Sequence, residues 1–167
     1  QKRSQILIRI QKEESWYSEE KPSLIILTES DLKWLPTTAV QKLSLLAKTK
    51  KEGYKIALVN QNIIILGHDD RGCLYGVGKL MREMKIQRGQ LSIPANFQIS
   101  ASPAYPIRGH QLGYRPKTNA YDSWTVKQYD QYIRDLAIFG ANSIEIMPPR
   151  TDDDASSVHM KLPAMDM

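Results

Sequence analysis

The chain has 167 residues, of which 41% are hydrophobic and 25% charged; this is the composition of a folded globular protein and excludes a disordered tail. Its net charge of +5 comes from lysines and arginines scattered among acidic residues, a pattern that disfavours a nucleic-acid-binding surface. No apolar run approaches the roughly 20 residues that a membrane-spanning helix needs, and no signal-peptide pattern is found, so no membrane span is expected.

The first half of the chain predicts an α/β fold. Four apolar, β-branched segments have strand character: 4–10, 23–30, 54–60 and 62–67. The last two segments follow each other almost directly, which predicts a hairpin that turns at the two residues Asn60 and Gln61. Apolar residues at helical spacing predict helices at 37–53, with Gly53 as the stop, and at 73–84. We expect a mixed sheet with both helices packed on one face.

The glycines between residues 67 and 78 raise the question of nucleotide binding, because they follow a predicted strand and lead into a helix. A phosphate-binding loop also needs a lysine followed by a serine or threonine that binds magnesium. Here Lys79 is followed by Leu80, and Cys73 occupies the position of the pattern's first glycine. We therefore expect the glycines to allow close packing, Cys73 to behave as a small buried hydrophobe, and the protein to bind no cofactor.

A connector follows this first α/β region. Residues 91–106 are rich in proline and serine and keep some strand character, as expected of a segment between two structural units. We place a domain boundary near residue 103, which divides the chain into parts 1–103 and 104–167.

The second part predicts a β-α-β unit. Strand character is found at 107–112 and again at 143–147. Between them, Thr125 and Gln128 form a capping box at the start of a helix that Gly140 ends. Such a unit has parallel strands joined by a right-handed crossover, and ligands bind at the carboxyl ends of its strands. This places two loops on the ligand side: 113–124 and 148–157.

Several segments in this order resemble a known arrangement: GYKIALV, NIIILG, RGCLYGVGKLMREM, LSIP and SPAYPIRG. They are similar to the small α/β domain that precedes the catalytic barrel in family-20 β-hexosaminidases and in related α-glucuronidase-like glycoside hydrolases. The segment from Tyr114 to Asp154 resembles the first β/α unit and second strand of such a (β/α)₈ barrel. The resemblance covers most of the chain from about Gly53 onward. It implies an accessory α/β domain at 1–103 and an incomplete TIM barrel at 104–167.

The resemblance also implies a substrate-binding role for Arg108, which occupies the arginine of the family's RG motif. A guanidinium suits vicinal hydroxyls or a uronic carboxylate, whereas the alternative is an arginine that links two strands to an acid. Four further residues are candidate sugar contacts from their positions on this strand and the two loops: His110, Tyr114, Asp152 and Asp153. In the alternative interpretation, His110 is a packing residue and Asp152 and Asp153 are acids exposed to solvent. Tyr121 and Trp124 are further stacking candidates, although Trp124 equally suits packing at the helix start.

The resemblance implies that the full-length protein hydrolyses O-glycosyl bonds of a hexosaminide- or uronide-containing glycan. The residues after RG, His110 to Leu112, lack the family-20 aspartate, which favours a more distant branch. The general acid of these families comes from a later strand, so no catalytic residue is expected in this chain, which alone should be inactive. A bacterial protein in a secreted, periplasmic or cell-envelope location is implied. The alternative is a non-catalytic carbohydrate-binding or assembly module built on residues 1–103.

The expected partners are an oligo- or polysaccharide and the remainder of the barrel, with self-association through unpaired strand edges. No metal site is expected, because His68 and His159 have no partner at metal-ligand spacing.

Overall fold

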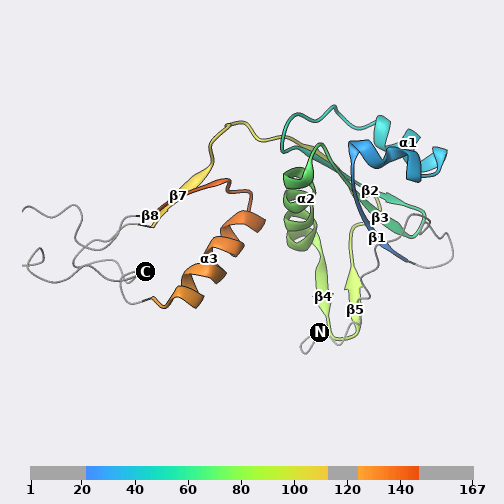
Figure 1. Ribbon diagram of the computed structural model, residues 1–167. Helices are drawn as coiled ribbons and strands as arrows, with labels where there is room; N and C mark the ends of the chain where they lie inside the picture. Colours follow the sequence, from blue (N-terminus) through green and yellow to red (C-terminus); the bar gives the residue numbers. More distant parts are fainter. Residues whose placement is uncertain (1–21, 113–123, 147–167) are drawn as a thin grey trace, which may run out of the picture. The chain divides into compact units, whose positions relative to one another are not determined.

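The computed structural model describes residues 22–112 and 124–146 (Figure 1). The chain forms two compact units, Gln1–Ala104 and Tyr105–Met167. The strand predicted at 4–10 lies outside the described residues, as do most of the 113–124 loop and all of the 148–157 loop. Over the described part of the chain, no helix has the length and apolar character needed to cross a membrane.

A four-stranded mixed sheet forms the centre of the first unit, with the strand order β1-β3-β2-β6. Strand β1 (Leu24–Thr28) runs parallel to β3 (Asn62–Gly67), and β2 (Tyr54–Val59) lies antiparallel to β3. The predicted hairpin is confirmed: two residues connect β2 and β3, and Asn60 there has a φ of 54°. Strand β6 (Gln98–Ala101) pairs with β2, so part of the predicted connector belongs to this sheet.

The two main helices cover opposite faces of the sheet, which corrects the expectation that both pack on one face. Helix α1 (Thr37–Ser44) follows a 3₁₀ helix, η1 (Glu29–Trp34), and packs with Ile64 and Leu66 of β3. Helix α2 (Asp70–Glu83) packs with the alternate residues Ile63 and Ile65. Because successive side chains of a strand point to opposite faces, the continuous apolar run of β3 needs cover on both sides.

Helix α1 is shorter than the sequence predicts, since it ends at Ser44 and not near Gly53. The Lys55 ammonium, from the neighbouring strand β2, donates to the Leu43 carbonyl oxygen at 3.1 Å. A carbonyl in the last turn of a helix has no partner inside that helix, so a lysine from elsewhere satisfies it. This contact between residues distant in sequence is not visible in the helical periodicity.

Helix α2 begins at an Asp69 cap, whose side chain accepts a hydrogen bond from the Gly72 N–H at 2.9 Å. Its glycines lie close to neighbouring segments, which confirms the predicted packing role. A Cβ added to Gly72 would overlap the Gly53 carbonyl oxygen, and one added to Gly76 would lie 2.5 Å from Ile65 Cγ2. After α2, a short hairpin is formed by β4 (Lys85–Gln87) and β5 (Gln90–Ser92).

The second unit contains the predicted β-α-β element. Strand β7 (Gly109–Leu112) pairs in parallel with β8 (Ser143–Ile146), and helix α3 (Val126–Ile138) connects them. The Thr125–Gln128 capping box at the start of α3 is confirmed, with the Thr125 side chain accepting from the Gln128 N–H. Gly140 follows the helix with a φ of +103°, the left-handed region that glycine adopts without strain.

Candidate functional site

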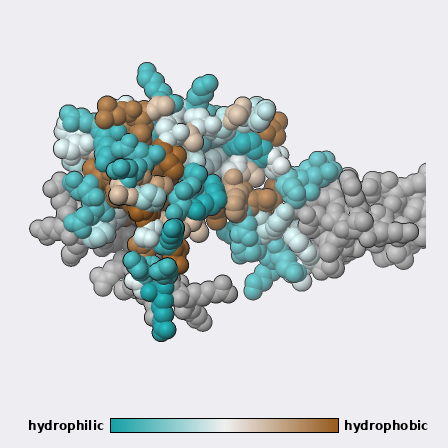
Figure 2. All heavy atoms as spheres, turned by 180° about the vertical axis from the view of Figure 1, so that it is seen from behind, coloured by the Kyte–Doolittle hydropathy of each residue, from teal (hydrophilic) through white to brown (hydrophobic). Residues whose placement is uncertain are grey.

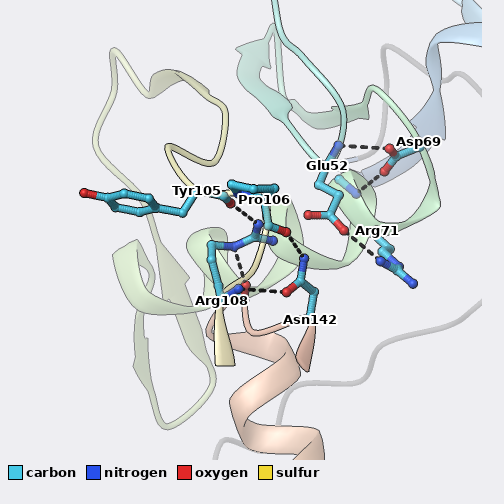
Figure 3. A network of polar contacts seen from close by, with 9 residues as sticks. Glu52, Asp69, Arg71, Tyr105, Pro106, Arg108 and Asn142 are labelled. Carbon is cyan, nitrogen blue, oxygen red and sulfur yellow. Dashed lines mark hydrogen bonds and ion pairs between the residues drawn. The ribbon is translucent and has the colours of Figure 1, made fainter. Parts of the chain in front are cut away.

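Arg108 lies just before β7 and binds backbone carbonyl groups. Its Nε donates to the Gly140 carbonyl oxygen at 2.9 Å, and its Nη1 donates to the Tyr105 carbonyl oxygen at 2.8 Å (Figure 3). Arg108 therefore links the segment before β7 to the turn after α3. The sequence left open an alternative in which Arg108 links two strands to an acidic residue. The observed role is similar, because Arg108 links two segments, but these two partners are backbone carbonyls and not an acid. A role in sugar binding stays a prediction.

Asn142, just before β8, holds the backbone of Arg108 on both sides. Its Oδ1 accepts from the Arg108 N–H at 2.9 Å, and its own N–H donates to the Arg108 carbonyl oxygen at 2.8 Å. Its Nδ2 also donates to the Pro106 carbonyl oxygen at 2.8 Å (Figure 3). These contacts fix the starts of the two strands relative to each other, so the register of β7 and β8 is set from this end.

His110 faces helix α3. Its Nδ1 lies 3.4 Å from the Tyr132 hydroxyl, and the two rings meet edge to face with centroids 5.7 Å apart. Trp124 packs edge to face on the same Tyr132, at 5.2 Å, and on Tyr129, at 5.6 Å. This geometry matches the alternative in which His110 and Trp124 are packing residues. Both side chains pack on tyrosines of α3.

The opposite face of this strand pair carries polar residues that sequence reasoning missed. Gln111 is the register partner of Glu145, and His110 is the register partner of Ile144. Since neighbours in a strand point to opposite faces, Gln111 and Glu145 lie on the face away from α3. Both are exposed. The sequence signal for these residues is the alternation of side chains along each strand, which puts them on the face opposite His110. That face can be identified only when the position of α3 is known.

The remaining predicted site residues are not brought together by the described structure. Tyr114, Tyr121, Asp152, Asp153 and His159 lie outside the described residues. His68 is surface-exposed and lies 3.2 Å from a Glu29 carboxylate oxygen. Within ranges 22–112 and 124–146, no three His, Cys, Asp or Glu side chains gather in a way that could hold a metal ion.

A buried charge in the first unit has a structural explanation. The Glu52 carboxylate accepts from Arg71 Nη1 at 2.8 Å, while the Glu52 N–H donates to Asp69 at 2.9 Å (Figure 3). The hydrogen bond and charge of Glu52 raise the pKa of Arg71 above its ordinary value. Glu52, Asp69 and Arg71 therefore join the turn before β2 to the start of α2, and each has a structural partner.

Cys73 lacks the properties of a nucleophile. Its thiol donates to the Leu27 carbonyl oxygen at 3.2 Å, and burial raises the pKa of the thiol above its ordinary value. A reactive cysteine needs the opposite, a lowered pKa that leaves the thiolate populated near neutral pH.

Comparison with solved structures relates this fold to glycoside hydrolases. A glycoside hydrolase family 20 β-N-acetylglucosaminidase matches with a TM-score of 0.53 and 17% identity over 74% of this chain and 21% of that chain. CpGH84B matches with a TM-score of 0.56 and 20% identity over 75% of this chain and 20% of that chain. BtGH115A, a family GH115 4-O-methyl-α-glucuronidase with specificity for decorated arabinogalactans, matches with a TM-score of 0.50 and 16% identity over 74% of this chain and 19% of that chain.

These likenesses establish the fold, which is that of a segment of glycoside hydrolases. The chain spans only about a fifth of the length of these structures. No protein-family model matches the sequence, and neither does any curated protein.

Proposed function

We propose that this chain is the N-terminal part of a glycoside hydrolase, with an accessory α/β domain at 1–103 and the start of a TIM-barrel catalytic domain at 104–167. The observation that carries the proposal is the fold likeness, which extends over about three quarters of this chain in each of three glycoside hydrolases. In the full-length protein, the proposed reaction is hydrolysis of an O-glycosyl bond in a hexosaminide- or uronide-containing glycan. The neighbours that are a β-N-acetylglucosaminidase and an α-glucuronidase support these two substrate classes.

The β-α-β element supports a barrel that continues beyond it. Within the described residues, β7 and β8 pair only with each other, in parallel. Parallel strands occur in larger sheets whose faces are covered, so two of them with one helix form part of a larger structure. A (β/α)₈ barrel takes about 250 residues, and glycoside hydrolysis uses a pair of carboxyl groups at the scissile bond. The remainder of the barrel is therefore the proposed partner and the proposed source of the general acid.

We place the proposed substrate side at the carboxyl ends of β7 and β8, where barrel enzymes bind ligands. The proposed sugar contacts include Tyr114, Asp152 and Asp153, in the segments that follow these strands. Arg108 remains a proposed contact by resemblance to the family, and His110 remains one by its position on β7. A secreted, periplasmic or cell-envelope location in a bacterium is proposed on the same resemblance.

The test compares the full-length protein with the 167-residue chain. The probes are 4-nitrophenyl N-acetyl-β-D-glucosaminide and 4-nitrophenyl α-D-glucuronide, with release of nitrophenol as the readout. We expect the full-length protein to hydrolyse one of them and the 167-residue chain to hydrolyse neither. A full-length protein that folds but cleaves neither substrate would contradict the proposed function.

A non-catalytic assembly module is the second candidate, because apolar side chains lie exposed along the edge of the first unit. On edge strand β1, Leu24 and Ile26 are each 48% exposed. Figure 2 shows hydrophobic patches between hydrophilic ones on the surface. No described strand pairs with the outer edge of β1, and an open edge of this kind is a template for pairing with another chain. The proposed occupant is the β1 edge of a second copy.

A further inference from the structure

The two faces of the β7–β8 pair differ in chemistry. Four residues occupy the face away from α3, and all are polar or glycine: Gly109, Gln111, Ser143 and Glu145. The α3 face carries His110 in contact with Tyr132, and Ile144 beside it in register. A parallel sheet with helices on both faces needs apolar residues on both, so the polar face of this pair is suited to water or to a polar ligand.

In a (β/α)₈ barrel the face away from the helices is the lumen. The lumen is filled mainly by bulky aliphatic side chains, and functional groups come from the strand ends on the carboxyl side. Gln111 and Glu145 are each the third of four residues in their strands, toward that carboxyl side. Ser143 opens β8 at the other end. The polar pair therefore lies at the level where a barrel strand begins to contribute to the site.

We infer that Glu145, with Gln111 beside it, is a substrate-contacting and specificity-determining residue of the barrel. This inference rests on the proposed function. The Glu145 carboxylate has two acceptor oxygens, which match two neighbouring sugar hydroxyls, and the Gln111 amide adds a donor. A carboxylate in the lumen repels a second carboxylate, so the pair favours a neutral hexosaminide over a uronide at this position.

The test uses the full-length protein with the variants Glu145→Gln and Glu145→Asp. Asp130→Asn is the matched control, because Asp130 is an exposed acid on α3 that pairs with Arg134 at 2.9 Å. The control removes the same charge from the same unit at a position outside the proposed lumen. The probes are the two nitrophenyl glycosides named above, and kcat and KM are measured for each.

We expect Glu145→Gln to lower kcat/KM on the glucosaminide by about tenfold or more, mainly through KM, because a hydrogen bond to a charged group is lost. The ratio of glucuronide to glucosaminide activity should rise in Glu145→Gln and stay near the wild-type ratio in Glu145→Asp, which keeps the charge. Asp130→Asn should behave as wild type in both respects.

The outcomes separate the two proposals. If the wild type hydrolyses a probe and Glu145→Gln matches Asp130→Asn, the inference fails and the proposed function stands. If Glu145→Gln lowers activity on both substrates equally and also lowers Tm, Glu145 is structural and the inference fails. If the folded wild type hydrolyses neither probe, the proposed function fails and this inference fails with it.

Discussion

Asn142 and Arg108 are joined by two hydrogen bonds, one from the Asn142 side chain and one from its backbone: Asn142 Oδ1 accepts from the Arg108 N–H at 2.9 Å, and the Asn142 N–H donates to the Arg108 carbonyl oxygen at 2.8 Å. These residues are adjacent to β8 and β7 respectively, so one amide side chain aligns two parallel strands that are separated by a helix. Parallel strands have no tight turn between them to set their register. The Asn142 side chain supplies part of that alignment.

We expect Asn142→Ala to loosen the strand pair in the 167-residue chain. The substitution removes the acceptor for the part-buried Arg108 N–H and the donor to the exposed Pro106 carbonyl, which should cost about 0.5–1.5 kcal/mol. Hydrogen exchange of the β7 and β8 amides should become faster. The control is Asn96→Ala, an exposed asparagine of the first unit. Equal exchange of these amides in both variants would show that Asn142 does not set the register.

Two glycines of α2 should respond differently to alanine. Alanine favours helix over glycine by about 1 kcal/mol, but a Cβ at Gly72 would overlap the Gly53 carbonyl oxygen, which belongs to the backbone. A Cβ at Gly76 meets Ile65 Cγ2, a side-chain methyl that can move. We expect Gly72→Ala to lower the free energy of unfolding by about 1–3 kcal/mol and Gly76→Ala to lower it less. Urea unfolding measures both, and the reverse order would contradict the close approach at Gly72.

The thiol of Cys73 is half-buried, and not fully buried as the sequence predicts, but this burial still implies that stability depends on pH. Burial raises the pKa of Cys73 in the folded state above its value in the unfolded chain. Its contribution to stability is therefore complete below the unfolded thiol pKa and decreases as pH rises above it, because the unfolded state then loses its proton more readily. The free energy of unfolding of the wild type should therefore decrease relative to that of Cys73→Ala as the pH rises above about 8. The decrease should be clear from about one pH unit above that value.

Urea unfolding of both proteins across this pH range measures the shift, and thiol labelling of the folded wild type should be slower than that of the unfolded chain. A difference that is constant with pH, together with fast labelling of the folded state, would contradict the raised pKa.

The exposed edge of β1 predicts self-association of the 167-residue chain. Replacing Leu24 and Ile26 by lysine should favour the monomer, because charges on an edge strand oppose pairing with another chain. Leu45→Lys is the control, since Leu45 is 86% exposed and lies outside the sheet. Sedimentation velocity at several concentrations measures the oligomeric state. A wild type that stays monomeric at all concentrations would remove the support for an assembly module.

The candidate site was only partly accessible to sequence reasoning. Resemblance to the family directs attention to Arg108, and position on a predicted strand directs it to His110; the structure shows the carbonyl partners of Arg108 and the tyrosine partner of His110. Gln111 and Glu145 carry no motif, so they stand out only when the register and the position of α3 are known. The roles of Tyr114, Asp152 and Asp153 stay predictions.

Features that depend on residues close together in the chain follow from the sequence. The Thr125–Gln128 capping box and the two-residue turn at Asn60 and Gln61 are local, since their hydrogen bonds and backbone angles involve only near neighbours. The alternation of strands and helices in an α/β chain is equally local, because each element has its own hydrophobic period.

Features that depend on distant residues were decided by tertiary packing. Helices α1 and α2 cover opposite faces because β3 is apolar on both, and a helical period by itself does not say which side of a sheet its apolar stripe will meet. The Leu43 carbonyl in the last turn of α1 accepts from Lys55 of strand β2, and the partners of Arg108 include a carbonyl 32 residues away. Each of these contacts requires the chain to fold back on itself, and local pattern carries no information about where it will do so.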